Sequence, residues 1–332
     1  MLFLASRAYV YHEAILCGAM FALWGGYFTL RWLAAPGHRW WWGALTCGVL
    51  SLHARPPCGL FALGLLGCAA LALAGRALVR NPSEPRIRWR VLCRPSAIAL
   101  LAALGVLSFN ALSYLKFESF SGAPLRYHVQ YNAARLAQIE GSNFHPGNFR
   151  HDFDAYVWRP DFTFRPTFPY FFLQRRDGPS YRDARIDLAE PTLALPFAMP
   201  ALSLLALGGA ALALVRWRES RVPLAIIAAG TGPMALALFT AIAISHRYTG
   251  DFCAPLVLAA AFGLSALDLL SVRARRMSWL ALAGLSVVGI FVTLAIALHY
   301  QGEMVWGVPD EIKSRYQMLR HAVDSALGFS RP

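Results

Sequence analysis

The sequence predicts an all-α protein, a polytopic membrane helix bundle of about eight spans with one large ordered outer loop. Its 332 residues are 57% apolar and 15% charged, whereas soluble domains average about 25% charged residues. The chain also contains at least seven long apolar stretches, more than the core of one soluble domain needs. This composition excludes a soluble globule, a disordered chain and a disulfide scaffold.

The spans follow from the length of the apolar stretches, because a membrane helix needs about 20 apolar residues. The seven stretches that satisfy this length are 14–33, 58–79, 95–115, 197–215, 223–245, 252–270 and 278–299. An eighth, Trp40–Leu52, has 13 residues and is followed by Pro56 and Pro57. Since consecutive prolines interrupt a helix, it is either a short, tilted span or half of a broken one. We count it as the eighth crossing.

The arginines predict the orientation of the bundle. Six of them lie within 76–94 against a single acid, Glu84, and two further groups lie within 216–222 and 271–277. Under the positive-inside rule these three loops are cytoplasmic, and alternation of the spans places 116–190 on the outer face. Because the net charge of +13 is concentrated in such loops, no nucleic-acid partner is expected.

This orientation divides the chain into four parts. They are 1–115, the first membrane helices with about four spans; 116–190, an extracytoplasmic aromatic-rich loop; 191–299, the last four membrane helices; and 300–332, an amphipathic outer tail. In the tail, apolar residues from Ile312 to Leu327 recur at helical spacing after Pro309 and Asp310, which predicts a surface helix.

The outer segment 116–190 differs in composition from the spans. It contains nine of the 18 acids, ten bases and sixteen aromatic residues, and a proline-broken aromatic run extends from Trp158 to Phe172. A neutral, aromatic-rich segment is typical of an ordered loop that lies on the membrane or covers a cavity. The aromatic run suits stacking on a lipid or sugar, and it equally suits anchoring at the interface.

The strongest cluster of polar residues at the outer face is His246, Arg247, Tyr248 and Asp251. Arg247 and Asp251 are four positions apart, so on a helical turn they share a face. One interpretation is that His246 and Arg247 bind a phosphate or sugar and that Asp251 orients them. The other is an ion pair at the membrane rim, with Tyr248 in the interfacial aromatic belt.

Two other ionisable residues lie beside outer helix ends. Arg55 precedes two prolines, where it would hold a phosphate at a helix break or extend its charge to the interface. Glu13, beside His12, would act as a base or substrate ligand, or as a helix cap. The sequence shows no zinc-like histidine spacing and no CxxC pair, so no metal and no cofactor are expected.

These residues together resemble a known family. Glu13 at a helix start, the break Arg55–Pro57, residues 110–117 entering the outer loop, and Arg247–Phe252 follow one another along the chain. They look like the later two-thirds of bacterial polytopic membrane proteins related to the GT-C glycosyltransferases, a group that includes protein mannosyltransferases and the aminoarabinose transferase of lipid A. The resemblance covers about residues 9–270.

The resemblance implies an inner-membrane cell-envelope protein that uses a polyprenyl-phosphate-linked sugar donor at the outer face. Its partners would be membrane lipid and this lipid-linked donor. Carried over residue by residue, Arg55 and Arg247 contact the donor phosphate, and His246 contacts it more weakly. Tyr248 and Asp251 support these cations.

The family's acidic residue lies in a first outer loop that this chain does not contain. The placement of residues 1–13 outside likewise suggests that upstream helices are missing. Glu13 and Asp251 are the remaining weak candidates for a catalytic base, and an acid held by an arginine is a poorer base. We therefore expect no sugar turnover by this chain alone. The alternatives are a non-catalytic membrane protein of lipid or polysaccharide transport or assembly, and a structural subunit without activity.

Overall fold

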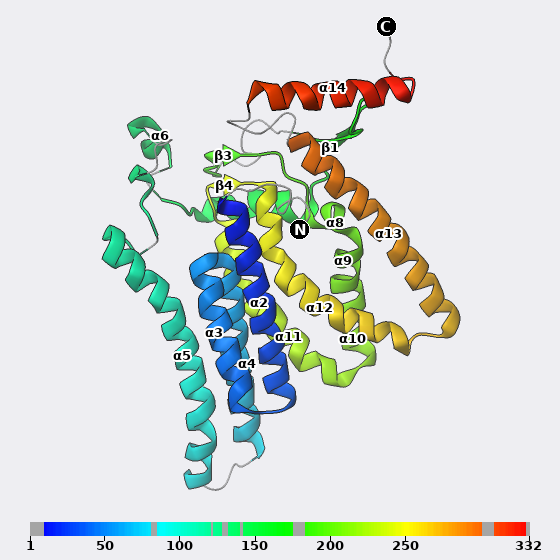
Figure 1. Cartoon of the computed structure of the whole chain (residues 1–332). Helices are drawn as coiled ribbons and strands as arrows, with labels where there is room; N and C mark the ends of the chain where they lie inside the picture. Colours follow the sequence, from blue (N-terminus) through cyan, green and yellow to red (C-terminus); the bar gives the residue numbers. More distant parts are fainter. Residues whose placement is uncertain are drawn as a thin grey trace.

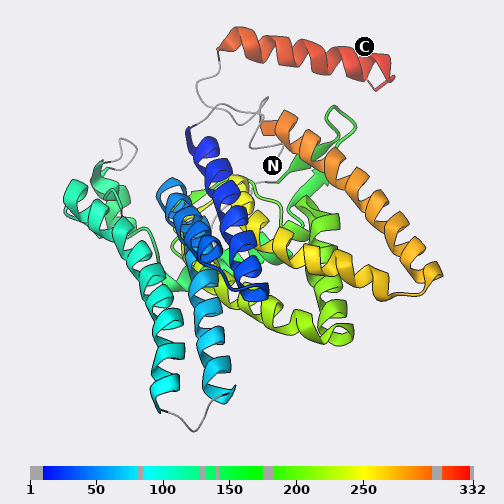
Figure 2. The same ribbon diagram turned by 60° about the horizontal axis from the view of Figure 1, so that its bottom comes forward.

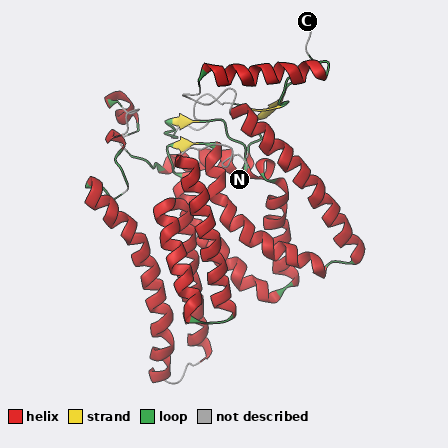
Figure 3. Ribbon diagram, viewed as in Figure 1, coloured by secondary structure: helices red, strands yellow, loops and turns green. Residues whose placement is uncertain are grey.

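The computed structural model describes residues 10–80, 85–120, 122–127, 132–139, 142–174, 183–300 and 309–329. Helices dominate it, as Figures 1 and 3 show. The longer ones are α2 (Val10–Ala34), α3 (His38–Ala54), α4 (Pro56–Arg80), α5 (Pro85–Phe117), α11 (Arg221–Phe239), α12 (Cys253–Ala266), α13 (Val272–His299) and α14 (Asp310–Ala326). The shorter ones are α6 (Ala133–Gln138), α7 (Phe149–Phe153), α8 (Leu195–Ala198), α9 (Pro200–Leu204) and α10 (Ala210–Arg216).

Six helical stretches of the described chain are long and apolar enough to cross a membrane. They are His12–Ala34, Pro56–Arg76, Arg94–Phe117, Arg218–Phe239, His246–Leu269 and Val272–His299. Each corresponds to one of the predicted apolar stretches. By the length and composition of its helices, the chain therefore belongs to the multi-pass membrane class.

The two other predicted spans are shorter. The stretch 40–52 forms α3, which has 17 residues. The stretch 197–215 is divided among α8, α9, the π-helical turn η4 (Leu205–Gly209) and α10, and its apolar part extends over Pro200–Arg216. Pro200 begins α9 after a non-helical Met199, because proline cannot continue a helix from the preceding turn. Within its described residues the structure thus has six long apolar helices where eight spans were predicted.

Helix α4 occupies the centre of the bundle. Its side chains Phe61, Leu65 and Leu66 are fully buried. Helices α2, α3, α5 and α11 all pack against α4, and Figure 1 shows α2, α3 and α4 side by side. The prolines after Arg55 do not bend one span, because α3 ends at Ala54 and α4 begins at Pro56 as a separate helix that packs along it. Proline is favoured at this first helical position, where its missing N–H costs nothing.

The later helices form a second layer beside this bundle. Helix α12 packs against η4 and α10, and also against α2. Helix α13 contacts α9 and the strand β2 (Phe171–Leu173), and Figure 2 shows it at the edge of the molecule. The predicted stretch 223–245 is helical only as far as Phe239, where α11 ends.

The prediction of an all-α chain is wrong in detail, because the structure contains short strands. Strand β1 (Phe162–Phe164) pairs antiparallel with β2, and β3 (Leu188–Ala189) pairs parallel with β4 (Ala243–Ile244). The β4 region reads Thr-Ala-Ile-Ala-Ile-Ser, with alternate isoleucines, and this period of two favours a strand. The sequence analysis did not predict this strand, because β4 lies at the end of the long apolar stretch 223–245.

The described parts of the segment 116–190 lie at one end of the bundle (Figure 1). Phe171 and Phe172 are buried, whereas Trp158 and Phe164 are exposed, so the aromatic run divides into core and surface residues. The predicted tail helix is present as α14, which lies across the same end (Figure 1). Asp324 of α14 accepts a hydrogen bond of 2.7 Å from the backbone N–H of Phe168 and so attaches the tail to this segment.

Candidate functional site

The break between α3 and α4 positions Arg55. This residue has an extended backbone (φ −151°, ψ 101°) between the two helices, and its side chain reaches Asp251. Nε of Arg55 donates to Oδ1 of Asp251 at 2.9 Å, and Nη2 donates to Oδ2 at 2.7 Å. The pair is bidentate, the geometry in which a guanidinium binds a carboxylate most strongly. Asp251 has no exposed side-chain surface, while 18% of the Arg55 side chain is exposed.

Neighbouring residues enclose this ion pair. The Cys58 thiol, one turn into α4, donates to Oδ1 of Asp251 at 3.3 Å. Gly18 of α2 lies so close to Arg55 that a β-carbon at position 18 would collide with the Arg55 side chain. Burial lowers the pKa of Arg55, but the Asp251 carboxylate raises it by more, so Arg55 remains charged. Asp251 is therefore the buried counter-ion of Arg55.

Tyr248 joins the two predicted phosphate-binding cations. The guanidinium carbon of Arg55 lies 4.7 Å from the centre of the Tyr248 ring, and that of Arg247 lies 5.5 Å from it. Both are cation–π contacts. Because the two cations share one ring, they lie within the roughly 10–12 Å that a diphosphate and two extended side chains span.

Arg247 has a different carboxylate partner. Its Nη2 lies 3.4 Å from Oε1 of Glu190, and the Ser245 hydroxyl donates to the other Glu190 oxygen. The side chains of Arg247 and Glu190 are 24% and 26% exposed, so water reaches this second ion pair.

The predicted shared face of Arg247 and Asp251 is wrong. Residues His246–Phe252 form a 3₁₀ helix, η6, with 3.0 residues per turn. Positions four apart therefore differ by about a third of a turn in direction. As a result Asp251 points to Arg55 of another helix and Arg247 points to Glu190 of the outer segment.

The other two candidates have separate surroundings. His246 is buried, its Nδ1 accepts a hydrogen bond of 3.4 Å from the Leu193 backbone N–H, and its ring lies 6.5 Å from that of Tyr300. It thus contacts the chain that follows Glu190. We call Arg55, Asp251, Tyr248, Arg247 and Glu190 the Arg55 cluster. Glu13 is exposed on the first turn of α2, which packs against η6. No ion pair joins Glu13 to the Arg55 cluster within the described part of the chain.

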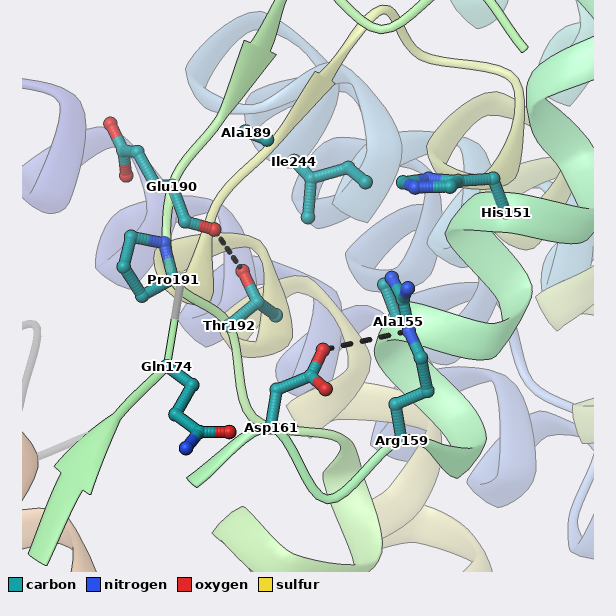
Figure 4. A pocket seen from close by; sticks show the side chains of 10 residues that line it. All are labelled: His151, Ala155, Arg159, Asp161, Gln174, Ala189, Glu190, Pro191, Thr192 and Ile244. Atoms are coloured by element: carbon teal, nitrogen blue, oxygen red, sulfur yellow. Dashed lines mark hydrogen bonds and ion pairs between the residues drawn. The ribbon is translucent and has the colours of Figure 1, made fainter. Parts of the chain in front are cut away.

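A small hollow lies beside the second ion pair. It is lined by His151, Ala155, Arg159, Asp161, Gln174, Ala189, Glu190, Pro191, Thr192 and Ile244. Figure 4 shows Arg159 directed at Asp161, at 3.5 Å, and the Glu190 carboxylate directed away from the other lining side chains. The Thr192 hydroxyl donates to the Glu190 carbonyl at 3.0 Å. The hollow measures about 20 Å³, which is room for a water molecule and not for a sugar.

Sequence reasoning did not single out Glu190, Arg159 or Asp152. All three lie within the outer segment, where nine acids and ten bases give no local pattern. Only the fold brings Glu190 to Arg247, through the parallel pairing of β3 with β4. Within the described residues no group of three His, Cys, Asp or Glu side chains is close enough to hold a metal ion.

Asp152 provides a test of the electrostatics of the outer segment. It is buried next to His151, whose Nδ1 lies 3.3 Å from Oδ1 of Asp152. Burial raises the pKa of Asp152 to about 9, against a smaller lowering by Arg159. The native state therefore keeps a proton that the unfolded chain releases above about pH 4. The retained proton therefore contributes to the free energy of unfolding. Its contribution is complete below about pH 4 and is lost as the pH rises toward 9.

We expect Asp152→Asn, which imitates the protonated carboxyl, to remove the fall in the free energy of unfolding between about pH 4 and pH 9. In the wild type this fall amounts to up to about 1.4 kcal/mol per pH unit. Thermal unfolding midpoints measured between pH 5 and pH 9 check this, with Asp154→Asn, two residues further along the chain, as the control. Equal pH slopes for the wild type and Asp152→Asn would show that Asp152 is ionised in the native state.

Comparisons with protein-family models, curated protein sequences and solved structures find no match to this chain. The geometry of the Arg55 cluster and the composition of the chain are therefore the basis for assigning a function.

Proposed function

We propose that this chain is a membrane glycosyltransferase-like protein, or part of one, that binds a polyprenyl-phosphate-linked sugar at the outer face of a bacterial inner membrane. The supporting observation is the convergence of Arg55 and Arg247 on one ring, Tyr248, from segments far apart in the sequence. Two arginines that converge on one ring suit a phosphate, because each guanidinium offers a planar set of donors.

The two cations have different roles in this proposal. Arg55 is held by a carboxylate without exposed surface, so it contributes a fixed position. The Arg247–Glu190 pair is partly exposed, with its closest N–O distance at 3.4 Å, so a phosphate can replace Glu190 as the partner of Arg247. This exchange would free the Glu190 carboxylate beside the bound donor. Glu190 then joins Glu13 as a candidate base, while Asp251 serves as the support of Arg55.

The direct test is binding of a polyprenyl phosphate to the purified chain in lipid nanodiscs. We expect Arg247→Gln to weaken binding about tenfold, since a hydrogen bond to a charged group contributes about 1.5–3 kcal/mol. The matched control is Arg275→Gln, which removes an exposed arginine that also lies 3.4 Å from a carboxylate, that of Asp268. Equal losses for the two variants, or none for Arg247→Gln, would contradict the proposal.

Two observations favour the non-catalytic alternative. The hollow beside Glu190 measures only about 20 Å³, and both cations of the cluster have carboxylate partners. A lipid transport or assembly protein needs to hold a phosphate but no base. Donor hydrolysis separates the two functions, because a transferase loses it in Glu190→Gln while a binding protein shows none in either form.

The orientation is part of the proposal, with α3 and Pro200–Arg216 as the seventh and eighth crossings. The arginine-rich loops 76–94, 216–222 and 271–277 are then cytoplasmic and 116–190 is outside. In a background without native cysteines, we expect a membrane-impermeant thiol reagent to label Arg150→Cys and to spare Arg86→Cys in sealed cells. Labelling of position 86 would reverse the orientation and exclude an outer-face donor site.

A further inference from the structure

A second, larger pocket lies at the other end of the bundle. It has a volume of about 490 Å³, within the roughly 300–1,000 Å³ typical of ligand sites. It is lined by Trp32, Pro36, Gly37, His38, Trp41, Leu73, Arg94, Pro95 and Ile98. These residues come from the end of α2, the α2–α3 connection, the start of α3, and parts of α4 and α5 next to them. Helices α4 and α5 extend beyond the α2–α3 connection in Figures 1 and 2.

The polar wall of this pocket carries positive charge. Nη2 of Arg94 lies 2.8 Å from Nε2 of His38. Between residues 14 and 115 the only acid is Glu84, which lies outside the described residues. Arg31 and Arg39 add further charge nearby, at 5.2 Å and 4.5 Å from the centre of the Trp40 ring. Among the described residues, no ion pair joins Arg31, Arg39 or Arg94 to a carboxylate, in contrast to Arg55 and Arg247.

The opposite wall is apolar. Ile98 and Trp32 are buried, and Leu73 and Trp41 pack against the same core. The spans His12–Ala34, Pro56–Arg76 and Arg94–Phe117 all end at this level, so the pocket lies at the boundary between hydrocarbon and water. Tryptophans are favoured at such a boundary.

We propose that this pocket binds one anionic phospholipid, independently of the Arg55 cluster and its donor. The lipid phosphate accepts hydrogen bonds from Arg94 and from His38, while the acyl chain lies along Leu73 and Ile98. A basic pocket between membrane helices at the interface has the chemistry that anionic headgroups require. A soluble phosphate ester would satisfy the cations but would leave the apolar wall uncovered, so the lipid accounts for both walls.

The test is native mass spectrometry of the full chain, purified in detergent, with added phosphatidylglycerol. We expect the wild type to retain one molecule, and Arg94→Gln to bind it about tenfold more weakly. Arg275→Gln, an exposed arginine of another loop, should bind as the wild type does. Leu73→Trp fills the pocket without changing its charge, and it should weaken binding even if Arg94→Gln does not fold.

Two competitors identify the source of the phosphate. Phosphatidylcholine with the same acyl chains carries no net charge, and glycerol 3-phosphate carries the phosphate without the chains. Neither should displace phosphatidylglycerol at equal concentration. Undiminished binding in both Arg94→Gln and Leu73→Trp would overturn the site. Displacement by phosphatidylcholine would overturn the role of charge, and displacement by glycerol 3-phosphate would overturn the assignment to a lipid.

Discussion

Asp251→Ala is expected to lower the free energy of unfolding by about 3–5 kcal/mol. The Asp251 carboxylate has no exposed surface and holds the Arg55 guanidinium through two hydrogen bonds of 2.7 Å and 2.9 Å. Its removal leaves a largely buried guanidinium without a counter-charge, and that penalty exceeds the modest net value of the intact pair. Denaturant titration in a fixed detergent, followed by circular dichroism, measures the loss.

Two comparisons identify the cause of that loss. Asp268→Ala removes the partner of Arg275 from an exposed pair, and it should cost no more than about 1 kcal/mol. The double variant Arg55→Met with Asp251→Ala removes both charges, so it should recover much of the stability lost in Asp251→Ala alone. If the double variant is as unstable as the sum of the single ones, Asp251 stabilises the fold through contacts other than Arg55.

The long helices were predictable because the signal for a membrane span is local. About 20 apolar residues in succession suffice to define a span, and six of the seven such stretches form a long helix, the exception being 197–215. The tail helix α14 was predictable for the same reason, from apolar residues at helical spacing. The exact lengths of the helices were not predictable. For example, α11 ends at Phe239 because the following chain forms β4, which pairs with β3 of the outer segment.

The contacts of the candidate site residues were not predictable from the sequence. Arg55 and Asp251 are 196 positions apart, and composition alone cannot show that two charged residues at helix ends will meet. The spacing of Arg247 and Asp251 indicated an α-helical turn, but the 3₁₀ geometry of η6 directs the two side chains to different partners. Local spacing therefore identifies candidate residues, while the tertiary fold decides which of them interact.

Gly263→Ala is expected to destabilise the second layer of helices by about 1–3 kcal/mol. At this position of α12 an added β-carbon would collide with the backbone carbonyl of Leu205 and would lie 2.9 Å from the α-carbon of Gly209. Backbone atoms cannot move aside by changing a rotamer, so α12 and the π-helical turn η4 must separate. Close approach through paired small residues is a common way for membrane helices to gain packing contacts.

Gly284→Ala in α13 is the matched control, because nothing lies within 4 Å of a β-carbon there. In that helix alanine should be neutral or should stabilise by up to about 1 kcal/mol, since glycine is the poorer helix former. The same gain acts at position 263, so the difference between the two variants in denaturant titration measures the cost of separating the helices. Equal unfolding midpoints for Gly263→Ala and Gly284→Ala would mean that α12 and η4 are not in backbone contact. The packing of the second layer would then have to be redrawn, because Gly209 and Gly263 provide its closest approach among the described glycines.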